Sequence, residues 1–291
     1  MRIRITLRDR KRISYLPINT NYYLAELLGK LTKNYESFLV SLLPEKLQKS
    51  GKFNFYTFSQ LIIPNRKIEK SRLAVYSPEL CWYVASPFIQ YLEIVAEELY
   101  KRKWIIIADN RYELRSIEFL KTPSFNGNEI HFTCLSPIAV LCNGDTNLRG
   151  KLTLDNFLFP EHKDFKPKLI EDIKLKYILL MGDRLKNIFF EFEFDAEYLR
   201  KRKNKISKLI AIEKNKHAPD YIRGFFAPFK VKTEQKILNL IYNIGLGQFN
   251  FMGFGMIAKV SQKYNESKYI SDNSKEIKYE PKDINYEYIQ S

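Results

Sequence analysis

The feature that most constrains the fold is the order in which two hydrophobic periodicities alternate over the first 122 residues. Alternation with a period of two is typical of strands, whereas apolar residues three and four apart predict helices. The strand-like runs are 2–7, 53–63, 73–86, 104–108 and 112–120. The helical segments are 21–42, which ends before Pro44, and a segment that opens at Pro87. The order strand, helix, strand, strand, helix, strand predicts an α+β unit of the ferredoxin-like type.

A second unit with the same kinds of pattern begins after residue 122. Its strand-like runs are 129–142, 188–194 and 253–260, with a candidate pair of strands at 206–212 and 221–231. Its helical segments are 166–182 and 233–243. We therefore predict two tandem ferredoxin-like domains, 1–122 and 123–261, and the second carries a glycine-rich loop. The polar residues 262–291 lack apolar periodicity and predict a mobile tail.

Cysteine usage and hydropathy exclude several classes of protein. The three cysteines, Cys81, Cys134 and Cys142, are scattered without a C-x-x-C pair, which argues against a disulfide framework and against a four-cysteine zinc site. No acidic cluster has the spacing of a two-metal centre, so we expect no metal and no cofactor. No apolar run approaches ~18 residues, and the first residues lack the hydrophobic stretch of a secretory signal. We therefore expect a cytoplasmic protein without a membrane partner.

The net charge of +15 favours a polyanionic partner. Residues 200–232 concentrate this charge, because they hold eleven Lys or Arg against only Glu213 and Asp220. Aromatic residues are interleaved, as in surfaces that stack bases and pair phosphates. The residues expected to grip RNA are Arg200, Lys201, Arg202, Lys203, Lys205 and Arg223. The alternative is a lysine-rich, solvated surface loop.

Four glycines lie within eleven residues between the last helix and the last strand, in the order Gly245, Gly247, Gly253 and Gly255. Glycine allows a positive φ and lets the backbone come close to a phosphate. We therefore expect this loop to cradle RNA phosphates, with Gln248 and Asn250 as further contacts. The form G-hydrophobic-G-x5-G-F-G-M resembles the C-terminal loop of the CRISPR repeat-processing endoribonucleases of the RAMP superfamily. Further stretches similar to this family are 2–5, 16–24, 55–59 and 135–140.

The resemblance implies two tandem ferredoxin-like domains, a basic cleft between them, and cleavage of a repeat RNA without metal. In this reaction the 2′-hydroxyl attacks the scissile phosphate, and the products are a 2′,3′-cyclic phosphate and a 5′-hydroxyl. The reaction needs a base, an acid and cations around the phosphorane. Repeat RNA is the implied partner, and a CRISPR effector complex and a second copy of the chain are further candidates.

The sequence departs from the family at its catalytic positions. The family tyrosine falls on Gly29 and the family histidine on Pro44, and neither residue can transfer a proton. Lysines are the remaining candidates, namely Lys30 and Lys33, one turn apart on a helix, and Lys52. Solvated lysines on a helix surface are the ordinary alternative for each. The three histidines, His131, His162 and His217, lie elsewhere in the sequence, and His217 falls inside the basic segment.

Three functions therefore remain open on the sequence. The leading hypothesis is a slow, metal-independent endoribonuclease that processes CRISPR repeat RNA. The second is a protein of the same architecture that binds repeat RNA without cutting it. The third is an unrelated basic protein that binds DNA or a membrane surface.

Overall fold

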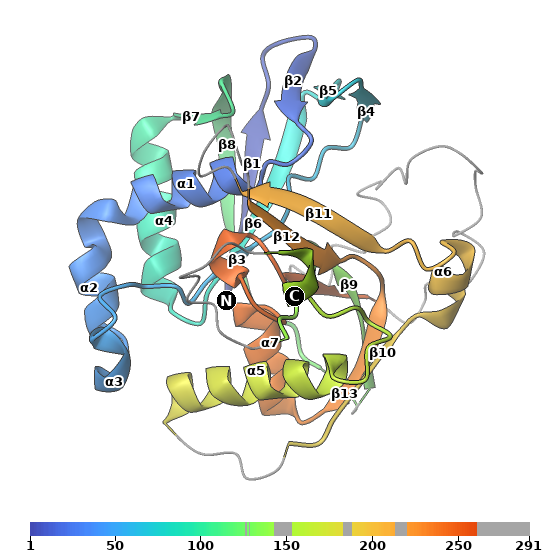
Figure 1. Ribbon diagram of the computed structural model, residues 1–291. Coiled ribbons are helices and arrows are strands. Elements are labelled where there is room, and N and C mark those ends of the chain that lie inside the picture. Colours follow the sequence, from blue (N-terminus) through green and yellow to red (C-terminus); the bar gives the residue numbers. More distant parts are fainter. Residues whose placement is uncertain (126, 128, 143–152, 183–187, 213–219, 261–291) are drawn as a thin grey trace.

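The computed structural model describes residues 1–125, 127, 129–142, 153–182, 188–212 and 220–260 of the chain. It contains two antiparallel sheets, each with helices on one face, together with a smaller three-stranded sheet and a hairpin (Figure 1). In the described part of the chain, no helix is long and apolar enough to span a membrane. The predicted tail, 262–291, lies outside the described residues.

The first sheet has the strand order β3-β6-β1-β8-β7. Its strands are β1 (Arg2–Arg8), β3 (Thr57–Phe58), β6 (Glu79–Ala85), β7 (Trp104–Ile107) and β8 (Asn110–Leu120). Helices α1 (Asn21–Thr32) and α4 (Ile89–Arg102) cover one face. The odd-numbered residues Ile3, Ile5 and Leu7 of β1 point into this core. The alternation found in the sequence therefore separates the side chains of the core face from those of the outer face.

The second sheet has the strand order β10-β13-β9-β14. Its strands are β9 (Glu129–Cys134), β10 (Phe190–Phe194), β13 (Phe229–Thr233) and β14 (Ile257–Lys259). Helices α5 (Phe165–Met181) and α7 (Gln235–Ile244) contribute to its core, in which Phe132, Phe192 and Phe229 pack together. Both sheets follow the strand order of the ferredoxin-like β-α-β-β-α-β unit, and this confirms the predicted fold class.

Several predicted elements have other bounds than expected. The helix 21–42 is divided into α1, the 3-10 turn η1 (Lys33–Tyr35) and α2 (Glu36–Ser41), and α3 (Glu45–Gln48) follows. At the first break, the Thr32 hydroxyl donates to the carbonyl of Leu28. This bond offers the backbone an alternative to a regular helix. Within 53–63 only β3 is a strand, because Phe53 and Tyr56 stack on Tyr91 of α4 instead of joining the ladder.

Two other predicted strands are each divided in two. The run 73–86 contains β5 (Arg72–Val75), which pairs with β2 (Ser14–Pro17) and β4 (Arg66–Glu69) in the three-stranded sheet, and then β6. The run 221–231 contains β12 (Asp220–Phe225) and β13. Strand β12 pairs with β11 (Ser207–Ile212) in a hairpin, whereas β13 joins the second sheet. The sequence analysis also missed helix α6 (Ala196–Lys201).

The two sheets meet at the first residue of β1. The fully buried Arg2 guanidinium donates to the carbonyls of Tyr242 (2.8 Å) and Ile257 (3.1 Å) and lies over the Tyr242 ring. A small apolar cluster continues this contact, with Tyr83 and Leu120 from the first sheet and Met256 from the second. The larger cores are separate, one formed by residues 3–112 and the other by residues 125–257. The domain boundary at residue 122 stays a prediction.

Candidate nucleic-acid interface

The hairpin β11–β12 lies beside the glycine-rich loop and reaches helix α1 (Figure 1). Its inner face buries Ile210, Ile212 and Ile222 against Phe249 and Phe254 of that loop. Gly224 permits this approach, since a Cβ there would come within 2.6 Å of the Pro137 side chain. The inner face of the hairpin is therefore packed against the protein, and its outer face is open to a ligand.

The outer face of the hairpin combines apolar and cationic groups. Leu209 and Tyr221 are exposed there, although large apolar side chains usually avoid water. The Arg223 guanidinium lies over the ring of Phe159, 4.6 Å from its centre, and Phe159 is itself half exposed. Aromatic rings and an arginine on one surface can stack the unpaired bases of a single-stranded nucleic acid.

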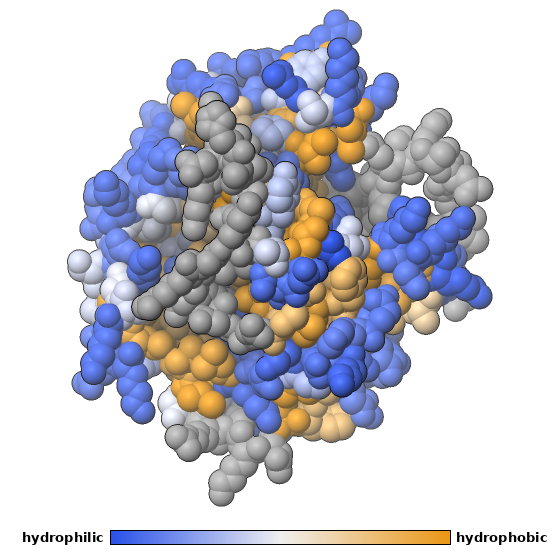
Figure 2. Space-filling model, in the orientation of Figure 1, coloured by the Kyte–Doolittle hydropathy of each residue, from blue (hydrophilic) through white to orange (hydrophobic). Residues whose placement is uncertain are grey.

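Helix α6 and the turn after it carry the densest part of the basic segment. Arg200, Lys203 and Lys205 are exposed, and hydrophilic residues gather over α6 in Figure 2. Lys201 pairs with Glu197 on the same helix, and Arg202 lies over the ring of Tyr198. The Asp195 side chain caps the helix by accepting a hydrogen bond from the Tyr198 amide. The helix therefore presents several cations on one short, capped element.

Lys208 of β11 brings cations from both halves of the chain together. Burial lowers the pKa of Lys208, and the nearby Arg66 and Arg202 lower this pKa further. Arg66 lies on β4 in the first half, and it donates to the Ile63 carbonyl. The Lys208 ammonium group also lies 4.7 Å from the centre of the Phe226 ring. Positive groups crowded in this way favour an anion between them, and we call Arg66, Lys208, Arg202 and the cations of α6 the basic band.

Two lysines of the basic segment do not belong to this band. Lys230 pairs with Glu193 (3.3 Å) and Glu129 (3.6 Å), and Lys232 pairs with Glu191 (3.8 Å), on the outer face of the second sheet. The strand register places these acids and lysines opposite each other. The sequence estimate of charge in residues 200–232 is therefore corrected, because part of it is neutralised by acids from distant positions in the chain. Lys214, Lys216 and His217 lie outside the described residues.

The glycine-rich loop requires its glycines for packing against the protein itself. Gly247, Gly253 and Gly255 all have a positive φ of 73–81°. A Cβ at these positions would overlap the carbonyl oxygen of Ala139, the ring of Phe58 and the carbonyl oxygen of Leu246, respectively. A residue with a side chain would be strained at each position.

The polar groups of this loop are also used inside the protein. The amides of Gly245, Gln248, Gly253 and Gly255 donate to the carbonyls of Ile241, Ala139, Asn250 and Pro137. The Gln248 side chain accepts a hydrogen bond from the Leu141 amide, and the Asn250 side chain donates to the Phe254 carbonyl. These groups have partners already, so the structure corrects the expectation that their amides are free for phosphates. A contact between the loop and RNA stays a prediction.

A buried ion pair on helix α5 contacts the glycine-rich loop, and the sequence analysis did not identify this pair. Lys176 of α5 donates to the carbonyls of Gly245 (3.2 Å) and Gly247 (2.6 Å) and pairs with Asp172 (2.8 Å). The two side chains are only 12% and 8% exposed. The spacing of four residues was visible in the sequence, but nothing there indicated that this pair faces the loop.

Comparisons with known proteins agree with this fold. Residues 120–259 match the sequence model described as CRISPR associated protein Cas6, C-terminal. The CRISPR-associated endoribonuclease Cas6 1 of Methanocaldococcus jannaschii is 26% identical over 92% of this chain and 96% of its own. The endoribonuclease-like protein Cas6nc of Pyrococcus horikoshii is 26% identical over 88% of this chain and 98% of its own. These matches support a Cas6-type, CRISPR repeat-processing family for the chain.

Solved Cas6 structures share the arrangement of both halves. A Cas6-related protein from Pyrococcus furiosus superposes with a TM-score of 0.71 at 24% identity, covering 90% of this chain and 99% of the other. A structure described as a RAMP protein binding different RNA substrates has a TM-score of 0.69 at 24% identity, over 90% of this chain and all of the other. The likeness therefore extends over both sheets.

The positions to which the sequence analysis assigns the family tyrosine and histidine are exposed. Gly29 lies on α1, and a Cβ there would meet no atom within 4 Å. Pro44 precedes α3, and its carbonyl accepts a hydrogen bond from the Leu47 amide. Neither residue has an acid or base, but neither position is sterically closed.

The candidate catalytic lysines lie near these positions in the chain. Lys30 forms an ion pair with Glu26 one turn earlier (3.0 Å), and its side chain is 62% exposed. Lys33 lies in η1 and Lys52 in the loop after α3, and both are exposed. Their part in catalysis stays a prediction. His131 on β9 lies 3.7 Å from Glu129, and His162 lies 3.7 Å from Asp164, so both face acids on exposed surfaces. Among the described residues, no three His, Cys, Asp or Glu side chains gather as a metal site.

Proposed function

We propose that the protein binds CRISPR repeat RNA along the basic band and cleaves it without a metal, by attack of the 2′-hydroxyl on the scissile phosphate. The products would be a 2′,3′-cyclic phosphate and a 5′-hydroxyl. The observation that carries the proposal is the convergence of Arg66, Lys208 and Arg202 on the fold of a Cas6 protein. Cations from two distant parts of the chain can hold one RNA strand where they come together.

The hairpin gives this binding site its preference for unpaired RNA. Phosphates would pair with the band, while bases would stack on Tyr221 and on the Arg223–Phe159 pair. Such stacking is available only to bases that are not already stacked in a duplex. The site therefore favours single-stranded segments of the repeat or the unpaired flanks of a weak hairpin.

The chemical step would depend on lysines. Lys30, Lys33 and Lys52 would stabilise the charge that develops on the phosphorane, since lysines are compact cations with three donors. The family histidine is replaced by Pro44, and loss of a positioned acid or base costs roughly 10²–10⁴ in rate. We therefore expect slow cleavage.

One observation favours a second function, which is binding of repeat RNA without cleavage. Gly29 and Pro44 supply no proton donor, and Lys30 is engaged by Glu26. A protein of this kind would keep the basic band and the hairpin and would protect the RNA. Delivery of RNA to a CRISPR effector complex in the cytoplasm, and pairing of two copies on one RNA, are compatible with either function. Light scattering of the RNA complex would measure the number of copies.

A cleavage assay separates the two functions. The repeat RNA is incubated with excess protein in EDTA, beside a repeat with a 2′-deoxy substitution immediately upstream of the scissile phosphate. Metal-independent attack predicts cleavage of the first RNA and none of the second. A joint Lys30→Ala, Lys33→Ala variant and a separate Lys52→Ala variant are expected to slow single-turnover cleavage more than they weaken binding. Cleavage that needs Mg²⁺ would contradict the mechanism, and an intact repeat would establish the second function.

Binding is tested by charge reversal with a matched control. Arg200, Arg202 and Lys203 are replaced by Glu, and the control replaces Lys101, Arg102 and Lys103 at the end of α4. Both variants change the charge equally at a helix end, but α4 and α6 lie on opposite sides of the molecule in Figure 1. We expect only the α6 variant to lose repeat-RNA affinity and to show a shallower salt dependence. Equal losses would contradict the location of the site.

A further inference from the structure

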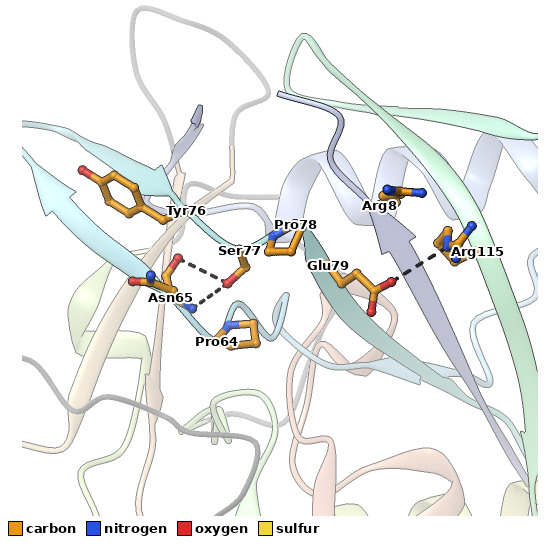
Figure 3. Close-up of a pocket in the computed structure, with 8 residues that line it drawn as sticks. All are labelled: Arg8, Pro64, Asn65, Tyr76, Ser77, Pro78, Glu79 and Arg115. Atoms are coloured by element: carbon orange, nitrogen blue, oxygen red, sulfur yellow. Dashed lines mark hydrogen bonds and ion pairs between the residues drawn. The ribbon is translucent and has the colours of Figure 1, made fainter. Parts of the chain in front are cut away.

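A cavity of about 540 Å³ opens at one end of the first sheet (Figure 3). Arg8, the last residue of β1, and Glu79, the first residue of β6, line it together with Arg115 of β8. The loop residues Asn65, Tyr76 and Ser77 and two prolines form the opposite wall. A volume of this size accommodates one nucleotide, since small-molecule pockets span about 300–1,000 Å³.

A β-bulge explains why two arginines meet there. Thr6 of β1 lies opposite Ser116, and the next residue, Leu7, lies opposite Leu114. Arg115 is therefore the extra residue of β8, without a partner on β1. The bulge keeps Leu114 against the core and turns Arg115 toward the outer face beside Arg8. Bulges often redirect a side chain next to a binding site in this way.

The two arginines are poorly neutralised. Among the described residues, the Arg8 guanidinium has no hydrogen bond or ion pair. Its neighbour Glu113 is engaged by two hydrogen bonds from Arg10, at 3.0 Å and 3.1 Å. Arg115 meets Glu79 at 3.8 Å, and both side chains are about half exposed, so this pair is weak. By contrast, Arg4 on the same face holds Glu118 at 2.6 Å.

The opposite wall is polar and held in place by backbone contacts. The Ser77 hydroxyl accepts a hydrogen bond from the backbone amide of Asn65 (2.6 Å). The backbone amide of Tyr76 donates to the backbone carbonyl of Asn65 (2.9 Å). The Tyr76 hydroxyl donates to Glu69 at 2.8 Å, which orients its ring. In Figure 3 the Asn65 and Tyr76 side chains point away from Arg8 and Arg115, so this wall closes the pocket and the arginines supply its charge.

We propose that this pocket binds one nucleotide of the RNA, with its phosphate on Arg8 and Arg115. The inference rests on the proposed function, because the ligand is a further nucleotide of the same strand. Asn65 precedes Arg66 in the chain, so the pocket continues the basic band. Helix α1, which carries Lys30, covers the other face of the sheet. The bound nucleotide therefore lies away from the lysines proposed for cleavage.

The test combines protein variants with shortened RNA. Affinities are measured for the full repeat and for repeats shortened one nucleotide at a time from each end, with wild-type protein and with Arg8→Ala, Arg115→Ala. We expect the variant to bind the full repeat about tenfold more weakly. The slope of log affinity against log salt concentration should become shallower by about 0.7 for each phosphate contact that is lost. For the RNA that lacks the pocket nucleotide, the two proteins should bind equally.

Two further variants distinguish the outcomes. Glu79→Gln frees Arg115 and removes a negative charge, so it should strengthen binding several-fold, and misfolding cannot produce such a gain. Arg102→Ala, Arg111→Ala removes the same charge outside the pocket and should leave the dependence on RNA length unchanged. Wild-type binding with no effect of Arg8 and Arg115 at any RNA length would overturn the pocket assignment alone. Failure of the wild-type protein to bind the repeat would overturn the proposed function and the pocket together.

Discussion

The ammonium nitrogen of Lys176 lies 2.6 Å from the carbonyl oxygen of Gly247, and this contact ties the glycine-rich loop to helix α5. The same ammonium group neutralises Asp172, which is 8% exposed. One lysine therefore satisfies a carboxylate and two carbonyls in a region from which water is largely excluded. The position of the loop, and through it the position of the hairpin β11–β12, depends on this side chain.

The first prediction concerns Lys176→Met. Removal of the cation leaves Asp172 buried without a partner, so we expect a loss of about 3 kcal/mol in the free energy of unfolding. Denaturant titration of the folded chain measures it. Lys168→Met is the matched control, because Lys168 pairs with Glu171 on the same helix but at an exposed site. The control should cost less than about 1 kcal/mol.

The origin of this loss can be checked with a second variant. Asp172→Asn combined with Lys176→Met removes the isolated charge and should recover part of the stability. No recovery, or an equal loss in the Lys168 control, would contradict a specific role for the ion pair.

The second prediction compares two glycines. In Gly255→Ala, the new Cβ meets the Leu246 carbonyl at a positive φ of 73°, so we expect a loss of about 3 kcal/mol or more. In Gly29→Ala, the Cβ enters open space on a helix, so we expect a gain of about 0.5–1 kcal/mol. Thermal denaturation of the two variants gives both values. Tolerance of alanine at position 255 would show that the loop can move away from Leu246.

The sequence predicted the two sheets because their strands show hydrophobic alternation and their helices show apolar stripes. It could not predict the break after Thr32. The apolar stripe continues past the break to Leu39, which is buried. The break comes from the local backbone conformation, and hydrophobic periodicity carries no information about it. Likewise, the aromatic run at Phe53 has the composition of a strand, but its rings pack on a helix. Such preferences are decided by tertiary contacts.

The candidate site shows the same limit. The glycines predicted a close backbone approach, and the structure contains several, to the carbonyls of Ala139 and Leu246 and to the ring of Phe58. The charge count in residues 200–232 predicted a basic surface. However, only the register of β13 shows that Glu191, Glu193 and Glu129 neutralise two of its lysines. Arg66 was missed because it joins Lys208 from another part of the chain.

The third prediction concerns pH. Burial and the neighbours Arg66 and Arg202 lower the pKa of Lys208 in the free protein, whereas a bound phosphate would raise it. Between these two pKa values, binding takes up a proton, so RNA affinity should fall as the pH rises through the lowered pKa. Titration of the affinity from neutral to alkaline pH measures this loss. Lys208→Arg keeps its charge throughout and should give a flatter profile. Identical profiles would remove Lys208 from the band.

The fourth prediction restores the missing chemistry. Gly29→Tyr and Pro44→His place the family side chains at the positions to which the sequence analysis assigns them, and both positions are exposed. If the protein already holds the scissile phosphate near α1, a histidine there can accept the proton of the 2′-hydroxyl. A tyrosine can then orient the phosphate. We expect the double variant to raise the single-turnover rate in EDTA about 10²-fold or more over wild type.

Two controls make this gain interpretable. Gly29→Phe with Pro44→His lacks the tyrosine hydroxyl, and Gly29→Tyr with Pro44→Gln lacks the base, so each should recover less of the rate. Repeat-RNA affinity should stay close to that of wild type in all variants, because none of these positions belongs to the basic band. A double variant that folds and binds normally but cleaves no faster would show that α1 and the turn before α3 do not frame the scissile phosphate. The reaction would then depend on the lysines alone, or the protein would act by binding.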